Sequence, residues 1–245
     1  MRSMRNLIIV ALISAVAGLI VMLPARVVYR WVVPPEIAIS GIHGTAWIGS
    51  ASEAAVNGFY LRDIEWRLNP LRFFTGTFSY QLNATPVSGF LESEVNVSFG
   101  GEVSLSRLRA ALPLELFAGA SGLRGLQGSA SLEFERVEFA DGFIVAADGT
   151  VKVADLVVPL IGRDSLGGYK AEFFTQNNGI AASIEDTDGV VDLAGSLQIK
   201  SDRTFRFLGQ VVAKPDTPQS VLKQLRFLPP ANDRGQQEVR LEGVL

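Results

Sequence analysis

Four carboxylates stand close together in the run EDTDGVVD, namely Glu185, Asp186, Asp188 and Asp192. Carboxylates at this density are typical ligands of calcium. A calcium-binding loop also needs a central glycine for its sharp turn and a closing bidentate glutamate. Here the glycine is misplaced and the closing glutamate is missing. The run therefore favours a solvated hairpin tip, and we predict no metal site.

The chain has few of the residues that nucleophilic catalysis requires. His43 is the only histidine available as a general base, and there is no cysteine. The sequence contains no G-x-S-x-G nucleophile elbow, no phosphate loop and no dinucleotide fingerprint. The net charge of −3 and a pI near 5.3 argue against a nucleic-acid partner. We predict a protein that is not an enzyme, has no cofactor, binds no nucleic acid, and holds His43 in a partly exposed loop.

Two tryptophans, Trp47 and Trp66, are candidates for a platform that binds sugar or lipid. Around Trp66 the sequence IEWRL alternates, with apolar side chains on one face and Glu65 and Arg67 on the other. A buried tryptophan removes about 200 Å² from water, a large term for a sheet. We therefore predict that both rings belong to the core.

The N-terminus carries the longest uncharged apolar run, LIIVALISAVAGLIVML at residues 7–23. As a helix it extends roughly 25 Å, slightly less than a bilayer core of roughly 30 Å. The run resumes after Pro24, broken only by Arg26 and Arg30, whose long side chains can reach the interface. We predict a cytoplasmic tail at 1–6 and a single transmembrane anchor with its juxtamembrane segment at 7–33, represented by Leu7, Ile13, Leu19 and Leu23.

A cleaved signal peptide is the alternative for this segment, because AVAG at residues 15–18 offers a small-residue cleavage site. The positive charges on the two sides of the apolar run are nearly balanced. They favour an N-terminus inside the cell only weakly. That orientation places residues 34–245 outside the cytoplasm.

Apolar and polar residues alternate with period two from about residue 38 onward, as in TFSYQLNA, and this is typical of a sheet with one buried face. Turn dipeptides separate the alternating segments, at 57–58, 141–142, 148–149, 178–179 and 188–189. A break at Glu135-Arg136 indicates a bulge. We predict a mainly β fold at 34–245: a long curved antiparallel sheet, a meander of hairpins that forms an open half-barrel or groove.

Helical spacing occurs in only two places. Leu105, Leu108 and Leu112 are spaced for a helix that ends at Pro113. The second place is TPQSVLKQLRFL, where Thr217 and Pro218 have the types of a cap and a first-turn residue. We expect one or two short helices that cover an end or edge of the sheet.

The segment GIHGTAWIGSA at 41 is echoed by GLRGLQGSA at 122. One hypothesis is therefore that the sheet consists of two related halves, at 41–118 and 122–245. No linker rich in Ser, Gly or Pro separates them, so one continuous sheet is expected.

The order GTAWIGS, then IEWRLNP, then GVVDLAGSLQIK with DRGQQEVRLEGVL resembles the type II secretion system protein N family. The residues that carry this resemblance are Gly44, Thr45, Trp47, Gly49, Trp66, Leu68 and Pro70. It implies a single-pass protein of the cell inner membrane with its main domain in the periplasm. It also implies an accessory subunit of the machine that exports folded proteins across the outer membrane, with other subunits of that machine as partners and no catalytic residues.

Two functions follow from this resemblance as hypotheses. In the first, the sheet is a scaffold that contacts other secretion subunits. In the second, the protein is an AsmA-like carrier whose apolar groove holds lipid acyl chains. The groove would be lined by Phe78, Tyr80, Leu82, Phe134, Phe205 and Phe207. A face that packs on itself as a closed core is the plain alternative to the groove.

Overall fold

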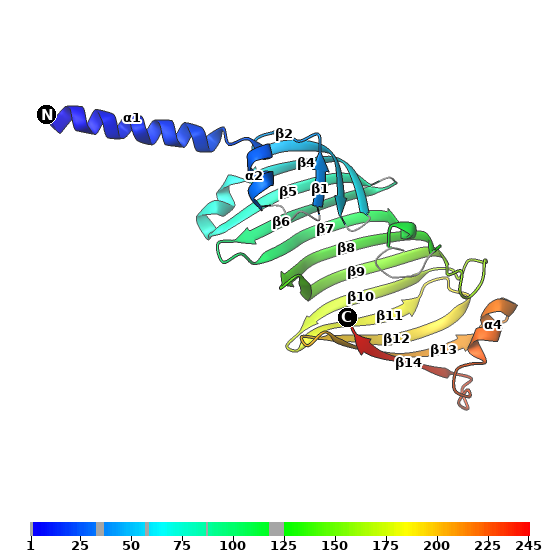
Figure 1. The fold of residues 1–245 in the computed structure, drawn as a ribbon. Coiled ribbons are helices and arrows are strands. Elements are labelled where there is room, and N and C mark those ends of the chain that lie inside the picture. The colour runs from blue at the N-terminus through cyan, green and yellow to red at the C-terminus, as the bar shows by residue number, and fades with distance from the viewer. Residues whose placement is uncertain (1, 33–36, 57–58, 87, 118–124) are drawn as a thin grey trace.

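The computed structural model describes residues 2–32, 37–56, 59–86, 88–117 and 125–245. The chain begins with helix α1 (Arg2–Val21) and continues with the shorter helix α2 (Ala25–Val32). A single antiparallel sheet follows, with two 3₁₀ turns, η1 (Pro70–Thr75) and η2 (Leu114–Phe117), and one late helix, α4 (Gln219–Leu225) (Figure 1).

The sheet has 14 strands, and apart from β2 they are neighbours in the order in which the chain makes them. The predicted meander of hairpins is confirmed. Its strands are β1 (Ile37–Ser40), β2 (His43–Gly44), β3 (Ile48–Val56), β4 (Phe59–Asn69), β5 (Thr77–Pro86), β6 (Phe90–Ser98), β7 (Val103–Pro113), β8 (Gln127–Ala140), β9 (Phe143–Val157), β10 (Tyr169–Gln176), β11 (Gly179–Asp186), β12 (Val191–Lys200), β13 (Thr204–Ala213) and β14 (Gln237–Val244).

The apolar helix α1 and the amphipathic helix α2 are separated at Pro24, which has no N–H to continue α1. Beyond it, α2 folds back onto the sheet, where Ala25 is 6% exposed. The predicted anchor and juxtamembrane segment at 7–33 thus form two separate helices in the described residues, α1 and α2. Within the described residues, none of the helices combines the length and the apolar character needed to cross a bilayer. Ile13 and Leu19 of α1 are exposed, and the side chain of Leu7 lies outside the described part of the structure.

The strand register sorts the turns into two ends. The turns 99–102, 141–142, 177–178 and 201–203 lie at the end near α1, here called the proximal end. The loops 158–168, 187–190 and 214–236 lie at the opposite, distal end. The predicted turns at Asp141-Gly142 and 188–189 are confirmed. The turn predicted at Asn178-Gly179 is present but lies one residue earlier, at 177–178, because Gly179 begins β11 and pairs with Gln176. The pair 57–58 lies outside the described residues, as does the 118–124 boundary between the two suggested halves.

The predicted turn at Asp148-Gly149 is wrong, because both residues lie inside β9. The Asp148 carboxylate accepts a hydrogen bond from the Thr175 backbone N–H at 2.8 Å on β10. That bond, helped by the Thr175 hydroxyl and Arg136, holds the pKa of Asp148 below its usual value. Gly149 faces the Phe134 ring across the strand pair, so its missing side chain makes room for an aromatic neighbour.

The predicted helix at residues 105–113 is also wrong, because this segment is strand β7. Arg107 has a positive φ of 52°, and the pairing with β6 shifts beside it. A bulge inserts one residue into the alternation. Leu105 and Leu108 therefore face the same side although they are three apart, which imitates a helical pattern. The neighbouring bulge at Glu135 in β8 is confirmed by the register shift between Phe134 and Arg136.

Helix α4 confirms the second predicted helix, but Thr217 does not cap it. The residue before the helix is Pro218, which makes no side-chain cap. The Thr217 hydroxyl instead donates to the Val190 carbonyl at 2.6 Å, and it accepts from the Lys214 N–H at 2.7 Å. Thr217 therefore ties the start of α4 to the loop between β11 and β12.

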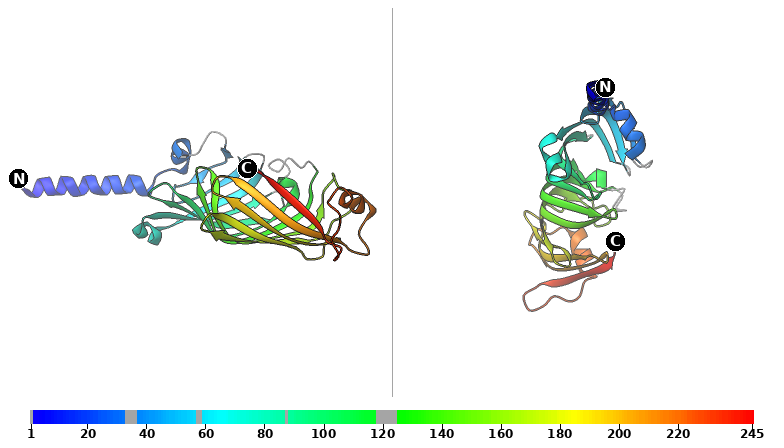
Figure 2. Two further views of the ribbon diagram at one scale, coloured as in Figure 1. Left: turned by 90° about the horizontal axis from the view of Figure 1, so that it is seen from below. Right: turned by 90° about the vertical axis from the view of Figure 1, so that its left-hand side faces the viewer.

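The sheet curves into a trough, visible from the end in Figure 2. Clusters of apolar side chains follow its inner face from β3 to β13. Near the proximal end α2 packs on this face through Ala25 and Tyr29. Near the distal end α4 packs on it through Val221. Each helix thus covers one part of the trough, and between them Leu114 and Phe117 of η2 pack against Ala130 and Leu132 of β8 and Val153 of β9.

Candidate functional site

The inner face of the trough is a continuous apolar row that runs across the strand pairs. Phe134 lies opposite Gly149, Gly149 opposite Phe173, Phe173 opposite Ala182, and Leu197 opposite Phe207. The six residues expected to line the groove lie on strands that form this face. Phe134 is the most buried of them, at 9% exposure. Phe78, Tyr80, Leu82, Phe205 and Phe207 are each partly exposed. The face is therefore an open apolar surface that has no second sheet against it in the described structure.

An apolar cleft of about 360 Å³ lies where α2 crosses the inner face. Its lining includes Tyr29 from α2, Trp66, Tyr80 and Val95 from the sheet, and no charged side chain. Burial raises the pKa of the Tyr80 phenol. A cleft of this kind favours apolar groups over water or ions.

The glycine and tryptophan motif surrounds the junction between α1 and the sheet. Gly44 has a φ of 84°, which suits glycine, and a side chain there would meet the Ile48 carbonyl. The Trp66 indole donates to the Thr45 carbonyl at 3.2 Å, and its ring occupies the space left by Gly49. Trp66 packs against the proximal core, as predicted. Pro70 starts η1 directly after β4, where the Asn69 side chain accepts from the Leu71 N–H.

Trp47 has a different place from the one predicted. It is only partly buried, and its indole N–H donates to the Ile20 carbonyl at 2.8 Å. That carbonyl belongs to the last turn of α1, where the residue four positions on is Pro24, which has no N–H. It also accepts from the Leu23 N–H at 3.2 Å. The Ala46 N–H donates to Leu23 O at 2.9 Å beside it. Trp47 therefore caps the end of α1 and attaches the helix to the sheet.

Replacing Trp47 by phenylalanine keeps the ring but removes the donor, so we expect the junction to loosen. The loss is about 1 kcal/mol, typical of one hydrogen bond. Hydrogen exchange at the Ala46 amide should then speed up about fivefold, while amides in β12 stay unchanged. The control is Trp31→Phe, because Trp31 is 76% exposed. Equal exchange at Ala46 in both variants would contradict the capping role.

His43 lies in β2, is exposed, and places Nδ1 2.6 Å from the Gly41 carbonyl. No cluster of metal-ligating side chains occurs among the residues that the structure describes. His43 thus lies in the short β2 rather than in a loop, and it contacts backbone alone in the bonds that the structure describes.

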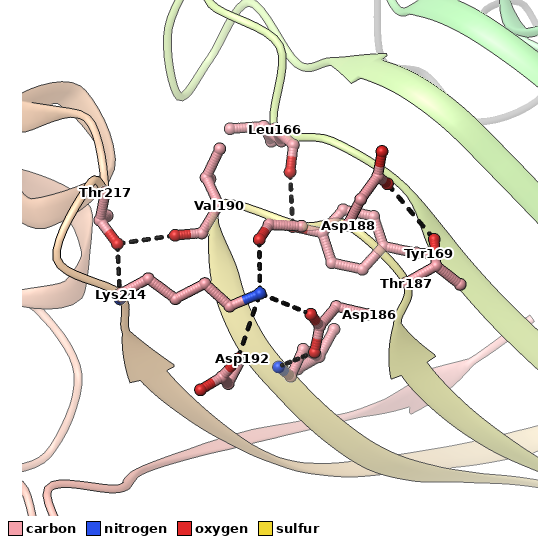
Figure 3. Close-up of polar contacts among 11 residues, drawn as sticks. Leu166, Tyr169, Asp186, Thr187, Asp188, Val190, Asp192, Lys214 and Thr217 are labelled. Atoms are coloured by element: carbon pink, nitrogen blue, oxygen red, sulfur yellow. Dashed lines mark hydrogen bonds and ion pairs between the residues drawn. The ribbon is translucent and has the colours of Figure 1, made fainter.

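The acidic run at 185–192 surrounds the loop between β11 and β12, and Glu185, Asp188 and Asp192 are exposed there, as the sequence predicts. Asp186 is the exception. Asp186 is 15% exposed and pairs with Lys214 at 2.8 Å (Figure 3). Lys214 also donates to the Gly189 carbonyl at 2.7 Å and reaches Asp192 at 3.1 Å, so all three of its protons have partners. We call these residues, together with Thr217, the distal clamp. Nothing local in the sequence points to Lys214, which is 28 residues from Asp186.

The contribution of the distal clamp to folding stability depends on pH. Burial alone raises the pKa of Asp186, but hydrogen bonds from Lys214 and the Leu193 N–H outweigh it, so the pKa lies below its usual value. The hydrogen bond to Asp186 raises the pKa of Lys214. The Asp186 contribution is present above the unfolded pKa of about 3.9 and is lost as pH falls through the lower folded value. The Lys214 contribution is lost only as pH rises through a folded pKa above about 10.4.

We therefore expect Asp186→Asn to lower the urea midpoint at pH 7 and to flatten the loss of stability between neutral and acid pH. Asp192→Asn is the matched control, because Asp192 contacts the same lysine but is 63% exposed. Its effect should be small, since exposed ion pairs contribute little. The measurement is urea unfolding at several pH values. If the stability of the two variants depends on pH in the same way, Asp186 is not the carboxylate that stabilises the distal clamp.

Together, the chain-ordered sheet, the apolar inner face and the two covering helices define an open β-trough protein. The chain belongs to the type II secretion system protein N family, because the model of that family, "Type II secretion system (T2SS), protein N", matches residues 35–240.

Three relatives bear the name type II secretion system protein N. The protein of Vibrio cholerae serotype O1 is 25% identical over 93% of both chains. That of Aeromonas hydrophila is 22% identical over 95% of both. That of Pectobacterium carotovorum is 21% identical over 91% of this chain and 90% of its own. No solved structure matches the chain significantly.

Proposed function

We propose that this protein is an inner-membrane accessory subunit of the type II protein secretion machine. It acts as a scaffold that supports export of folded proteins from the periplasm across the outer membrane. Membership of the family supports the link to the machine. The observation that carries the scaffold role is the free edge of the sheet at β14.

Strand β14 is the last in the sheet order and pairs with β13 along eight residues, from Gln237↔Val211 to Val244↔Thr204. The backbone groups on its other side face away from the sheet. Unpaired N–H and C=O groups in a row are a template for an added strand. On its outer surface Glu242 pairs with Arg206 at 2.8 Å. A partner strand that adds here would extend the sheet and the trough together.

Site-directed crosslinking in cells with the complete machine tests this role. A photo-crosslinking residue at Arg240, on β14, should capture another secretion subunit. The same residue at Arg109, on the central strand β7, is the control; the two side chains are 59% and 66% exposed. Capture that is equal at both positions, or absent at 240, would reject the edge as the contact. Normal export after deletion of the gene would reject the supporting role.

The inner-membrane location is part of the same proposal. Its support is α1, whose exposed side chains include Leu12 at 64% and Leu19 at 74%. Aliphatic groups exposed in this number favour lipid over water. Reporter fusions at the C-terminus should be active outside the cytoplasm. An active cytoplasmic reporter at that position would contradict the orientation.

The acyl-chain carrier is the alternative, and the feature that it would use is the apolar cleft beside α2. Neither the family description nor the names of the relatives mention a lipid ligand. Native mass spectrometry of the purified full chain tests it. Absence of bound lipid, with no lipid crosslinks at Tyr80 or Val95, would end this alternative.

A further inference from the structure

A group of exposed apolar side chains lies at the proximal end of the sheet, on η1 and the turn after β6. We call it the aromatic tip, and it consists of Leu71, Phe73, Phe74 and Phe99, which are 75%, 49%, 86% and 61% exposed. Apolar side chains gathered on a surface in this way mark a contact with a partner. The question is which partner this position can meet.

The conformation of the aromatic tip is fixed by its own contacts. Asn69 caps the start of η1, and Gly76 ends it with a φ of 79°. The Phe73 ring packs at 5.5 Å from both Phe78 and Phe99, and the latter two lie 5.3 Å apart. The edge-to-face and tilted packing holds the rings together. Phe74 and Leu71 are left pointing into solvent from this support.

The tip and α1 share one end of the molecule. The Trp47 indole is bonded to Ile20 O of α1, and the Trp47 carbonyl accepts from the Leu68 N–H at 2.6 Å. Leu68 and Asn69 then lead directly into η1. Figures 1 and 2 show α1 leaving the sheet at the end where η1 protrudes. A bilayer that holds α1 therefore lies on the side of the sheet that carries the tip.

The chemistry of this end fits a lipid surface. Exposed aromatic side chains beside arginines are typical of proteins that sit at the headgroup level. Arg72 lies within η1, and α2 adds Arg26, Arg30 and the exposed Trp31 at the same end. Positive charges next to apolar groups suit anionic headgroups. Phe227 is equally exposed, at 85%, but it follows directly after α4, which lies at the end of the sheet opposite α1 (Figure 1).

We propose that the aromatic tip inserts into the headgroup region of the same phospholipid bilayer that holds α1. This inference rests on the proposed membrane location of α1. The two contacts together set the angle of the sheet to the membrane, because the second contact fixes the tilt and rotation that α1 alone can adopt in the bilayer. The proximal mouth of the trough then lies beside the membrane surface, and the distal clamp lies away from it.

Fluorescent labelling of the full chain tests this, since the protein has no cysteine and any introduced one is unique. The variants are Phe74→Cys at the tip, Phe227→Cys at the distal end and Leu12→Cys in α1. Each carries an environment-sensitive NBD label and is reconstituted into vesicles of phosphatidylethanolamine and phosphatidylglycerol. We expect labels at 74 and 12 to shift to the blue and to be quenched by nitroxide lipids. The label at 227 should be quenched by aqueous iodide instead.

The outcomes separate the two proposals. If the label at 12 is quenched by lipid and that at 74 behaves like 227, the tip inference is overturned and the anchor stands. If neither is quenched by lipid, both are overturned. A second variant, Phe74→Asp with the label at Phe99→Cys, should lose lipid quenching at 99 while the far-ultraviolet circular dichroism stays unchanged. Quenching at 99 that survives this charge would also overturn the inference.

Discussion

Replacing Phe134 by alanine is expected to lower the free energy of unfolding by about 3–5 kcal/mol. Phe134 is 9% exposed and packs with Val137, Ala147 and Ile180. Its ring lies 5.7 Å from that of Phe173. The strand partner on β9 is Gly149, which has no side chain to fill the vacated space. The cavity left by the substitution therefore stays largely open, which places the cost in the upper part of the range for core residues.

The matched control for this substitution is Phe174→Ala. Phe174 lies on β10 directly after Phe173, but it points away from the core and is 43% exposed. Its loss should cost under about 1 kcal/mol, because surface substitutions are mostly small. Urea unfolding of the detergent-solubilised chain, followed by circular dichroism, measures both. Similar costs for the two phenylalanines would show that the inner face is not the core of the sheet.

Adding a single methyl group at Gly49 is expected to destabilise the protein by about 1–3 kcal/mol. A Cβ there would stand 2.4 Å from the Trp66 ring and 2.5 Å from the His43 carbonyl. A ring can shift, but the carbonyl belongs to the β2–β3 pairing and moves only with the backbone. The strain therefore reaches the junction that holds α1. Gly100→Ala is the control, since its nearest neighbour is Ser98 Oγ at 3.5 Å.

Combining Gly49→Ala with Trp66→Ala separates the ring from the backbone contact. Removing the ring relieves one of the two clashes, so the double variant should lose less stability than the sum of the single losses. Residues in contact commonly show a coupling of about 0.5–3 kcal/mol. Strict additivity, measured in the same urea experiment, would mean that Gly49 and Trp66 do not share this space.

Much of the sheet was predictable because its signals are local. Alternation over a few residues shows which side chains of a strand share a face, and Asp-Gly or Asn-Gly pairs favour the turn itself. The same local reasoning failed at Asp148-Gly149, where the glycine serves a neighbouring ring. It failed again at Leu105 and Leu108, where a bulge at Arg107 changes the phase of the alternation.

The candidate sites were predictable only in part. The aliphatic and aromatic lining of the trough follows from periodicity, and so does the place of Trp66. The role of Trp47 does not, because its partner Ile20 is 27 residues away and accepts through a backbone carbonyl that any residue has. The distal clamp was missed for the same reason. An acidic run next to a glycine is typical of a solvated loop. The pairing of β11, β12 and β13 is what places Lys214 beside Asp186.

By itself the sequence determined that this chain forms strands, that consecutive strands are joined as hairpins, and which family the chain belongs to. Those properties depend on neighbours in the chain and on residue types. Only the tertiary structure decided which face is concave, where α2 and α4 cover it, and which end carries the aromatic tip beside α1. These features depend on the accumulated twist and bulges of many strand pairs and on contacts between distant residues. A short stretch of sequence does not encode them.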